Sequence, residues 1–255
     1  MFRNFIRKIF YFLRDIFYNP ILNQKFNFYF RNKKNYIFFT ERIDKKNNYL
    51  TDLANRFGSD KGGEINKNIC KRKILNNYTP LYEKLFSKNR LNLKLFFELG
   101  VGTNNEDVPS NMGRNGIPGA SLFMWQEYFP NAEIYGADID KRILFNKDRI
   151  KTFHVDQYSS ESIKNMWKEI NKNNFDVILD DGIHDYKGNI NFFENSFEFL
   201  KTGGIYIIED VDNIYVNKFR EYFQNSNFEV EMIDYFHKTH HNIEYNKRVI
   251  VIYKN

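Results

Sequence analysis

The chain has 255 residues, of which 42% are apolar, with 13 Gly, 5 Pro and a single cysteine, Cys70. This length and composition predict one globular α/β domain with an appendage, and they argue against a disordered chain or two full domains. A single cysteine excludes an internal disulfide and is typical of a protein of the reducing cytoplasm.

The positive charge is concentrated in the first 50 residues. They contain eleven Lys or Arg and three acidic residues, a formal charge of +8, whereas the whole chain carries +6. The remaining chain is therefore close to neutral, at −2 on the same count. A nucleic-acid-binding domain needs the basic excess on its folded body, so no nucleic-acid partner is expected.

Residues 1–18 have the pattern of a basic amphipathic helix, with apolar residues at helical spacing up to Pro20. Charged residues interrupt the run, so it does not form a transmembrane span, and no small-residue cleavage site follows it. The helix either lies on an anionic membrane at the cytoplasmic face, or packs on the domain or on a second subunit of a homo-oligomer. Residues 21–50 are expected to form a loose connector to a domain of residues 51–255.

From residue 90 onward, short apolar runs alternate with helical stretches. The runs are Leu93–Leu99, Glu133–Asp138, Ile150–Val155, Phe175–Asp180 and Gly204–Asp210. Helical patterns lie between them at residues 120–129, 161–170 and 189–201, the last ending before Gly203 and Gly204. This alternation predicts a Rossmann-like parallel sheet with helices on both faces. Residues 228–235 and 248–253 predict an antiparallel edge at its C-terminal side.

Three successive strand ends carry groups suited to an adenosine-containing cofactor. After the first strand, Gly100 and Gly102 let the backbone turn sharply and approach a ligand. Asp138 ends the second strand, where an acid can accept both ribose hydroxyls, and Asp156 with Gln157 follows the third, where they can bond an adenine edge. Either aspartate is equally suited to capping a helix N-terminus.

The fourth and fifth strands end in acidic clusters. Asp180, Asp181 and His184 follow the fourth strand, and Glu209 and Asp210 close the fifth. Neighbouring strand ends lie roughly 5 Å apart, and carboxylates this close repel one another unless a cation lies between them. Oxygen ligands suit Mg²⁺ or Mn²⁺, and a histidine is a suitable base for a hydroxyl acidified by such an ion. Taken alone, the first cluster also fits an ordinary turn.

With these residues in place, the chain resembles the metal-dependent sugar O-methyltransferases of the class I S-adenosylmethionine type over roughly residues 50–215. The segments that carry the resemblance are "FGSDKG" (57–62), "YTPLYEKLF" (78–86), "ELGVG" (98–102), "PGASLFMWQEYFP" (118–130), "IYGADI" (134–139), "DQ" (156–157), "DDGIH" (180–184) and "GGIYIIED" (203–210). Members of this family methylate deoxysugars of macrolide antibiotics, and relatives occur in surface-glycan gene clusters.

The resemblance implies Mg²⁺-dependent, in-line transfer of a methyl group to a sugar hydroxyl. It implies that Asp181, Glu209 and Asp210 are the metal ligands and that His184 is the general base. The residues that would hold S-adenosylmethionine are Glu98, Gly100, Gly102, Asp138, Asp156 and Gln157, with Ser121 and Asp180 near its methionine end.

The composition is rich in Asn, Lys, Ile and Phe, as in A+T-rich bacterial genomes, and this favours a capsule or other surface-glycan sugar as acceptor. His237, His240 and His241 are candidates for contacting that sugar. Three alternatives stay open: O-methylation of a catechol or natural product, a non-catalytic scaffold for glycan assembly, and a nicotinamide-dependent oxidoreductase. The last is disfavoured because Asn105 stands where the dinucleotide fingerprint has its third glycine.

Overall fold

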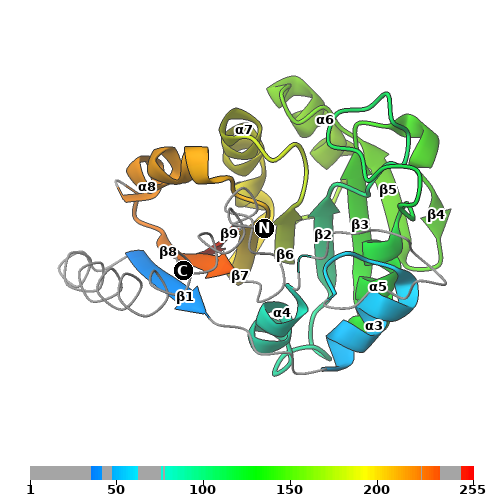
Figure 1. Cartoon of the computed structure of the whole chain (residues 1–255), viewed down its shortest axis with the longest axis horizontal. Helices are drawn as coiled ribbons and strands as arrows, with labels where there is room; N and C mark the ends of the chain where they lie inside the picture. The colour runs from blue at the N-terminus through cyan, green and yellow to red at the C-terminus, as the bar shows by residue number, and fades with distance from the viewer. Residues whose placement is uncertain (1–35, 42–47, 63–75, 77, 225, 236–247) are drawn as a thin grey trace, which may run out of the picture.

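The computed structural model describes residues 36–41, 48–62, 76, 78–224, 226–235 and 248–255. Within these residues one sheet has the strand order β1-β8-β9-β7-β6-β2-β3-β5-β4 (Figure 1). The strands are β1 (Tyr36–Glu41), β2 (Leu95–Leu99), β3 (Glu133–Asp138), β4 (Asn146–Lys147), β5 (Ile150–His154), β6 (Phe175–Asp180), β7 (Leu200–Ile208), β8 (Glu229–Tyr235) and β9 (Arg248–Tyr253). The central strands β5, β3, β2, β6 and β7 are parallel, and β9 is antiparallel to both β7 and β8.

Helices cover both faces of this sheet. They are α3 (Tyr49–Phe57), α4 (Thr79–Phe86), α5 (Ala120–Tyr128), α6 (Ser160–Ile170), α7 (Tyr186–Ser196) and α8 (Val216–Gln224), with short 3-10 helices η2 (Lys141–Ile143), η3 (Phe197–Phe199) and η4 (Asn213–Tyr215). In the view of Figure 1, α6, α7 and α8 lie above the sheet, and α3, α4 and α5 lie below it. The predicted parallel sheet with helices on both faces is therefore confirmed.

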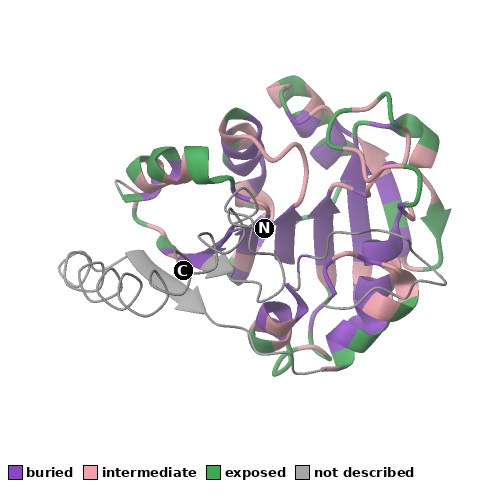
Figure 2. Ribbon diagram, in the orientation of Figure 1, coloured by how far each residue is buried: buried purple, intermediate pink, exposed green. Residues whose placement is uncertain are grey.

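Each face of the sheet has its own apolar core, because successive strand residues point to opposite faces. Phe97 packs with Trp167 of α6 and Phe192 of α7 in one core, whereas Phe96 packs with Trp125 of α5 in the other. Figure 2 shows the central strands as buried almost throughout. A sheet covered on both faces explains why these strands read as continuous apolar runs.

The predicted helix over residues 189–201 is wrong at both ends. The structure begins α7 at Tyr186 and ends it at Ser196, and β7 already begins at Leu200. Gly203 has a φ of 75° inside β7, where the pairing with β6 shifts register, so the glycine serves an irregularity in a strand and does not end a helix.

The N-terminal expectations have a mixed outcome. Residues 1–35 lie outside the described part of the chain, so the basic helix of residues 1–18 stays a prediction. Residues 36–41, expected in a loose connector, instead form β1, which pairs in parallel with β8. The C-terminal strand pair is therefore not the outer edge of the sheet, because β1 supplies hydrogen bonds to the edge that β8 would otherwise expose. No helix among the described residues is long and apolar enough to cross a bilayer.

The chain reverses its direction of travel across the sheet between β2 and β6. From β2 it proceeds to β3 and β5 on one side, and it then returns to β6 and β7 on the other. In open parallel sheets, ligands bind outside the carboxyl ends of the strands at such a switch point. The residues that follow β2 and β6 therefore frame the candidate site.

Candidate active site

A sharp turn after β2 opens the site. Gly100 has a φ of 91° and Gly102 a φ of 85°, a backbone region that L side chains rarely adopt. A Cβ on Gly100 would lie 2.1 Å from the carbonyl oxygen of Asp181, so only glycine lets the chain after β2 pass the chain after β6. The predicted sharp turn at these glycines agrees with this geometry, and their predicted approach to a ligand stays a prediction.

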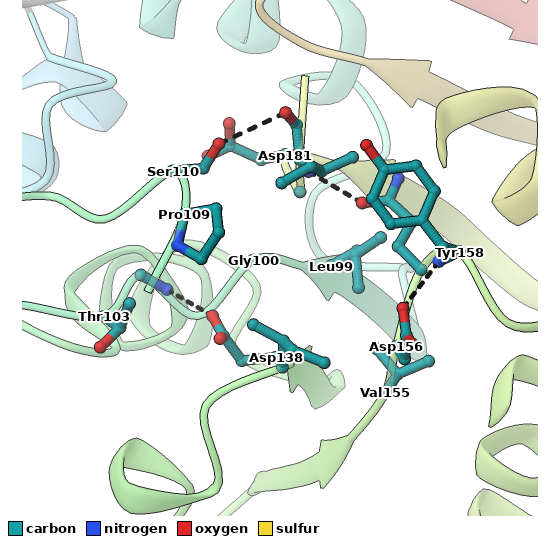
Figure 3. A pocket seen from close by; sticks show the side chains of 15 residues that line it. Leu99, Gly100, Thr103, Pro109, Ser110, Asp138, Val155, Asp156, Tyr158 and Asp181 are labelled. Carbon is teal, nitrogen blue, oxygen red and sulfur yellow. Dashed lines mark hydrogen bonds between the residues drawn. The ribbon is translucent and has the colours of Figure 1, made fainter. Parts of the chain in front are cut away.

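The first of two cavities lies over this turn and has a volume of about 180 Å³. Figure 3 shows Asp138 and Asp156 on one side of it and Ser110 and Asp181 on the other. Asp138 is buried, and its carboxylate accepts the N–H groups of Gly102 at 3.1 Å and Asp140 at 2.9 Å. Burial raises the pKa of Asp138 despite these bonds. The acid ends β3 where the sequence predicts a ribose contact.

Apolar side chains complete this cavity. Leu99, Ile139, Val155 and Ile183 line it, and Tyr158 stands at its rim with 47% of its surface exposed. Apolar walls with a few convergent polar groups are typical of small-molecule and cofactor sites. Sequence reasoning did not assign these apolar side chains, because they carry no signal beyond their place at a strand end or turn.

Gln157 and Asp180 are joined beneath the first cavity. Gln157 Nε2 lies 3.0 Å from both carboxylate oxygens of Asp180, and Gln157 Oε1 accepts the N–H of Ile183 at 2.8 Å. Asn189 Nδ2 donates to Asp180 at 2.9 Å. Asp180 is fully buried, which raises its pKa to about 6, and it does not line either cavity. Its carboxylate therefore orients Gln157, which does line the first cavity.

A long loop between β2 and α5 covers the site. Thr103 Oγ1 and Asn105 Nδ2 donate to the buried carboxylate of Asp140, at 2.6 and 2.7 Å. Asn105, which stands where a dinucleotide fingerprint has glycine, therefore anchors the loop. Further along, Ser110 lines both cavities and its Oγ donates to the carbonyl of Ile183 at 3.3 Å. Sequence reasoning assigned no role to Thr103 or Ser110 of this loop.

The second cavity has a volume of about 220 Å³ and shares Gly100, Gly102, Ser110 and Asp181 with the first. Its other lining residues include Ser121 at the start of α5, residues 58–61, His184 and Asp210. The shared wall means that a ligand in the first cavity lies next to whatever the second cavity holds. Of the residues predicted near a methionine end, Ser121 lies here.

Three potential metal-ligating groups meet in the second cavity. Asp181, His184 and Asp210 each offer one ligand atom, and these atoms lie within 4.8 Å of one another. His184 Nε2 is 3.2 Å from Asp181 Oδ1, and His184 Nδ1 is 3.7 Å from Asp210 Oδ2. Burial alone would raise the pKa of Asp181, but Lys61 and His184 hold it below its ordinary value. The structure thus brings together three residues that the sequence predicts at adjacent strand ends.

Two of these residues have strained backbones. His184 has a φ of 62° and Asp210 a φ of 54°, in the left-handed region that is uncommon outside glycine. Asp185 follows His184 as the N-cap of α7, accepting from the N–H groups of Lys187 and Gly188. The hydroxyl of Tyr78 donates to Asp210. Non-glycine residues in this region are concentrated at functional sites, where the surrounding structure holds them in place.

Glu209, the third predicted metal ligand, is not part of the Asp181–His184–Asp210 group and has different contacts. It is fully buried, its Oε2 accepts from Lys61 Nζ at 2.6 Å, and the hydroxyl of Tyr82 donates to its Oε1. Burial and the neighbouring charge of Asp181 raise its pKa well above the ordinary value. Glu209 therefore adjoins the Asp181–His184–Asp210 group from behind, and its predicted role as a ligand stays a prediction.

Glu98 also lies behind the cavities. It is fully buried at the end of β2, where its carboxylate accepts from Trp125 Nε1 at 3.1 Å and pairs with Lys61 at 3.2 Å. Burial raises its pKa to about 7, although Lys61 offsets part of the rise. Its contact with Ser121 links it to the cavity that it does not itself line.

Sequence reasoning missed Lys61, Tyr78 and Tyr82, which contact the carboxylates of the site. A signal for them exists, because "FGSDKG" and "YTPLYEKLF" contribute to the family resemblance and the two tyrosines are four residues apart, on one helix face. His237, His240 and His241 lie outside the described residues, so their predicted contact with the acceptor stays a prediction.

The donor set fits a hard divalent cation. Carboxylate oxygens dominate the cluster, as Mg²⁺ and Mn²⁺ prefer, and a neutral imidazole is a further nitrogen donor or a base. The first cavity fits an adenosine, since it combines apolar walls with carboxylates at two successive strand ends. Both fits rest on residues that the fold brings to one edge of the sheet.

Comparison with known proteins agrees with this geometry, although no family model matches the chain. The chain is 30% identical over 166 residues to the 8-demethyl-8-alpha-L-rhamnosyl tetracenomycin-C 2'-O-methyltransferase of Streptomyces olivaceus. This aligned segment covers 65% of the chain and 38% of the relative. It is also 30% identical over 166 residues to the mycinamicin VI 2''-O-methyltransferase of Micromonospora griseorubida, in an alignment that covers 65% of this chain and 37% of that relative. The chain therefore spans less than two fifths of the length of these curated relatives.

Solved structures establish the fold. The MycE methyltransferase of the mycinamycin biosynthetic pathway, in complex with Mg and SAH, aligns with a TM-score of 0.57 and 22% identity, over 82% of this chain and 55% of that one. The same enzyme with mycinamycin VI also bound gives a TM-score of 0.56. Over about two thirds of its length the chain is thus similar in sequence to sugar O-methyltransferases from macrolide and polyketide pathways, and it shares the fold of the MycE methyltransferase.

Proposed function

We propose that the protein transfers a methyl group from S-adenosylmethionine to a sugar hydroxyl, with a divalent cation as cofactor. The observation that carries this proposal is the wall of Gly100 and Asp181 shared by the two cavities, one suited to adenosine and one to a cation. The sequence similarity to sugar O-methyltransferases supports it, as do the Mg and SAH in the structure of the MycE methyltransferase.

The first cavity would hold the cofactor, which supplies a methyl group already activated on a sulfonium sulfur. Asp138 would hold the ribose, and Asp156 and Gln157 would hold the adenine. The backbone turn at Gly100 and Gly102 lets the cofactor pass from the first cavity toward the second. Its methionine end would then reach Ser121, with Glu98 beneath it.

The second cavity would hold the cation through Asp181 and Asp210, with Glu209 as the further predicted ligand. When bound, such a cation acidifies a hydroxyl held beside it. His184 removes the hydroxyl proton at a ring nitrogen, and Asp181 and Asp210 on either side fix the ring. As the proton leaves, the sugar oxygen forms the new O–C bond and the S–C bond of the cofactor breaks.

We infer further that the acceptor is a sugar of a capsule or another bacterial surface glycan. The composition bias supports this inference, whereas the curated relatives are named for sugars attached to antibiotic aglycones. We also propose that the enzyme works in the cytoplasm and that residues 1–18 contact the inner face of the membrane or a second subunit.

A product-level experiment tests the reaction. The full chain is incubated with S-adenosylmethionine, Mg²⁺ and a panel of free, nucleotide-linked and glycan-borne sugars, and new O-methyl groups are located by mass spectrometry and NMR. We expect one sugar hydroxyl to be methylated. Methylation of catechols but no sugar would assign the chain to the first alternative, and binding of NAD with no affinity for S-adenosylmethionine would overturn the proposal.

A further inference from the structure

Lys61 is a buried cation at the centre of the acidic site. Its side chain is 1% exposed and its ammonium contacts carboxylates from three different strand ends. Nζ lies 2.6 Å from Asp181 Oδ2, 2.6 Å from Glu209 Oε2 and 3.2 Å from Glu98 Oε1. These acids follow or end β6, β7 and β2, so one ammonium joins three neighbouring strands.

The backbone around Lys61 holds the side chain in this position. The N–H of Thr79 donates to the Lys61 carbonyl at 3.1 Å, and the N–H of Lys61 donates to Ser59 Oγ at 3.3 Å. A Cβ on the following Gly62 would lie 2.6 Å from Asn55 Oδ1, so the turn packs tightly against α3. The lysine is therefore part of the folded core and not a surface side chain turned inward.

The charges of the site require such a cation. Glu98 and Glu209 are fully buried, and each is near Asp181. Ionised carboxylates removed from water are strongly destabilising unless they are paired and hydrogen-bonded. Lys61 supplies one charge-assisted contact to each of the three acids, two of them at the short distance typical of strong ion pairs.

We propose that Lys61 is an internal counter-cation that keeps the acidic site assembled in the absence of a divalent ion. Lys61 contacts the carboxylates of Asp181 and Glu209, which are also proposed ligands of the ion. When no ion is bound, Lys61 balances part of their negative charge. This inference rests on the proposed function only for the identity of the ion. The role of Lys61 in the metal-free protein does not depend on it.

Lys61→Met tests the inference, because methionine removes the charge and keeps an unbranched apolar side chain. Thermal unfolding of the full chain is measured in EDTA and in Mg²⁺ or Mn²⁺. We expect Lys61→Met to lower the melting temperature in EDTA by roughly 6–20 °C, the effect of breaking a buried ion pair in a chain of this size. Saturating Mn²⁺ should raise the melting temperature of this variant more than that of the wild type.

Two further variants separate charge from packing. Glu209→Gln in the Lys61→Met background removes one unbalanced carboxylate and keeps an acceptor for Tyr82, so it should recover at least half of the lost melting temperature in EDTA. Lys88→Met, at an exposed lysine that follows α4, should change nothing. If Lys61→Met is obtained only with Mn²⁺ present, or only together with Glu209→Gln, the inference is equally supported.

Other results would overturn the inference. They are a Lys61→Met protein as stable as the wild type in EDTA, a double variant no more stable than Lys61→Met, or failure of both to fold even with Mn²⁺. If the double variant recovers while Mn²⁺ stabilises none of the proteins, Lys61 is a counter-cation and the proposed metal dependence is wrong. If Mn²⁺ stabilises the wild type and Lys61→Met loses no stability in EDTA, the metal site is supported and Lys61 is not a counter-cation.

Discussion

The two cavities that meet at Gly100 and Asp181 are built in different ways. The cofactor cavity consists of a backbone turn and of residues at or just beyond the ends of strands, such as Asp138, the last residue of β3, and Asp156, two residues after β5. The metal cavity depends on contacts between distant segments, since Lys61 reaches acids 120 and 148 positions along the chain. All the residues that line the first cavity lie between Leu99 and Ile183, whereas the second cavity also needs residues 58–61 and Asp210 from outside that segment.

Loss of the metal should have the largest effect, and it should reduce turnover without reducing cofactor binding. Asp181→Asn removes a carboxylate charge from the cation site, and we expect turnover to fall by at least about 10⁴-fold because several kcal/mol of transition-state stabilisation are lost. Affinity for S-adenosylhomocysteine should change little. Radiolabelled methyl transfer and calorimetry measure the two quantities.

EDTA on the wild-type protein is the matched control, and added Mn²⁺ should restore its activity. Full turnover by a protein shown to be free of metal would contradict the metal cavity as described.

His184→Ala tests the base within the same cavity. The rate should fall by about 10²- to 10⁴-fold, the usual contribution of a general base, while the affinity for the cofactor stays near that of the wild type. The wild-type rate should rise with pH and level off as the imidazole loses its proton, and the variant should lack this step. Loss of bound Mn²⁺ in the variant would instead make His184 a ligand.

Asp138→Ala should affect the cofactor cavity and leave the metal cavity unchanged. Loss of ribose hydrogen bonds worth about 1–3 kcal/mol predicts a roughly 5- to 150-fold weaker affinity for S-adenosylmethionine. Mn²⁺ affinity, measured by electron paramagnetic resonance in the absence of cofactor, should be unchanged. An unaltered cofactor affinity would move the ribose to another part of the cavity.

The smallest effect compares two helix caps. Asp185 caps α7 beside His184, which lines the metal cavity, and Ser159 caps α6, none of whose residues lines that cavity. Replacing either residue by Ala should lower the folding stability by about 1 kcal/mol. Only Asp185→Ala should also slow turnover, because loss of the cap releases the strained backbone of His184. Equal turnover in the two variants would mean that the cap does not position His184.

The same division explains what could be predicted from the sequence. Apolar runs of strand length and the glycines after β2 predict the parallel sheet and the turn at Gly100, since both depend on local patterns. The acids at the ends of β6 and β7 are also readable, because consecutive parallel strands are usually neighbours. The contacts of Glu209 with Lys61 and Tyr82 were not readable, because no local pattern specifies which segments meet across more than a hundred residues.

Irregular elements were missed for a different reason. The pairing of β1 with β8 and the placement of Gly203 within β7 depend on which strand edges remain to be paired. Such outcomes follow from the assembled sheet and not from the segment itself, so a glycine after a helical pattern was read as a helix end.

The closeness of the two cavities is tested most directly by placing a paramagnetic ion in one and observing the ligand in the other. NMR of S-adenosylmethionine bound to the full chain is recorded with Mg²⁺ and then with Mn²⁺, without an acceptor. We predict strong broadening of the cofactor methyl protons by Mn²⁺ in the wild type and its loss in Asp181→Asn. Unbroadened methyl signals with both ligands bound to the wild type would contradict the shared wall at Gly100 and Asp181.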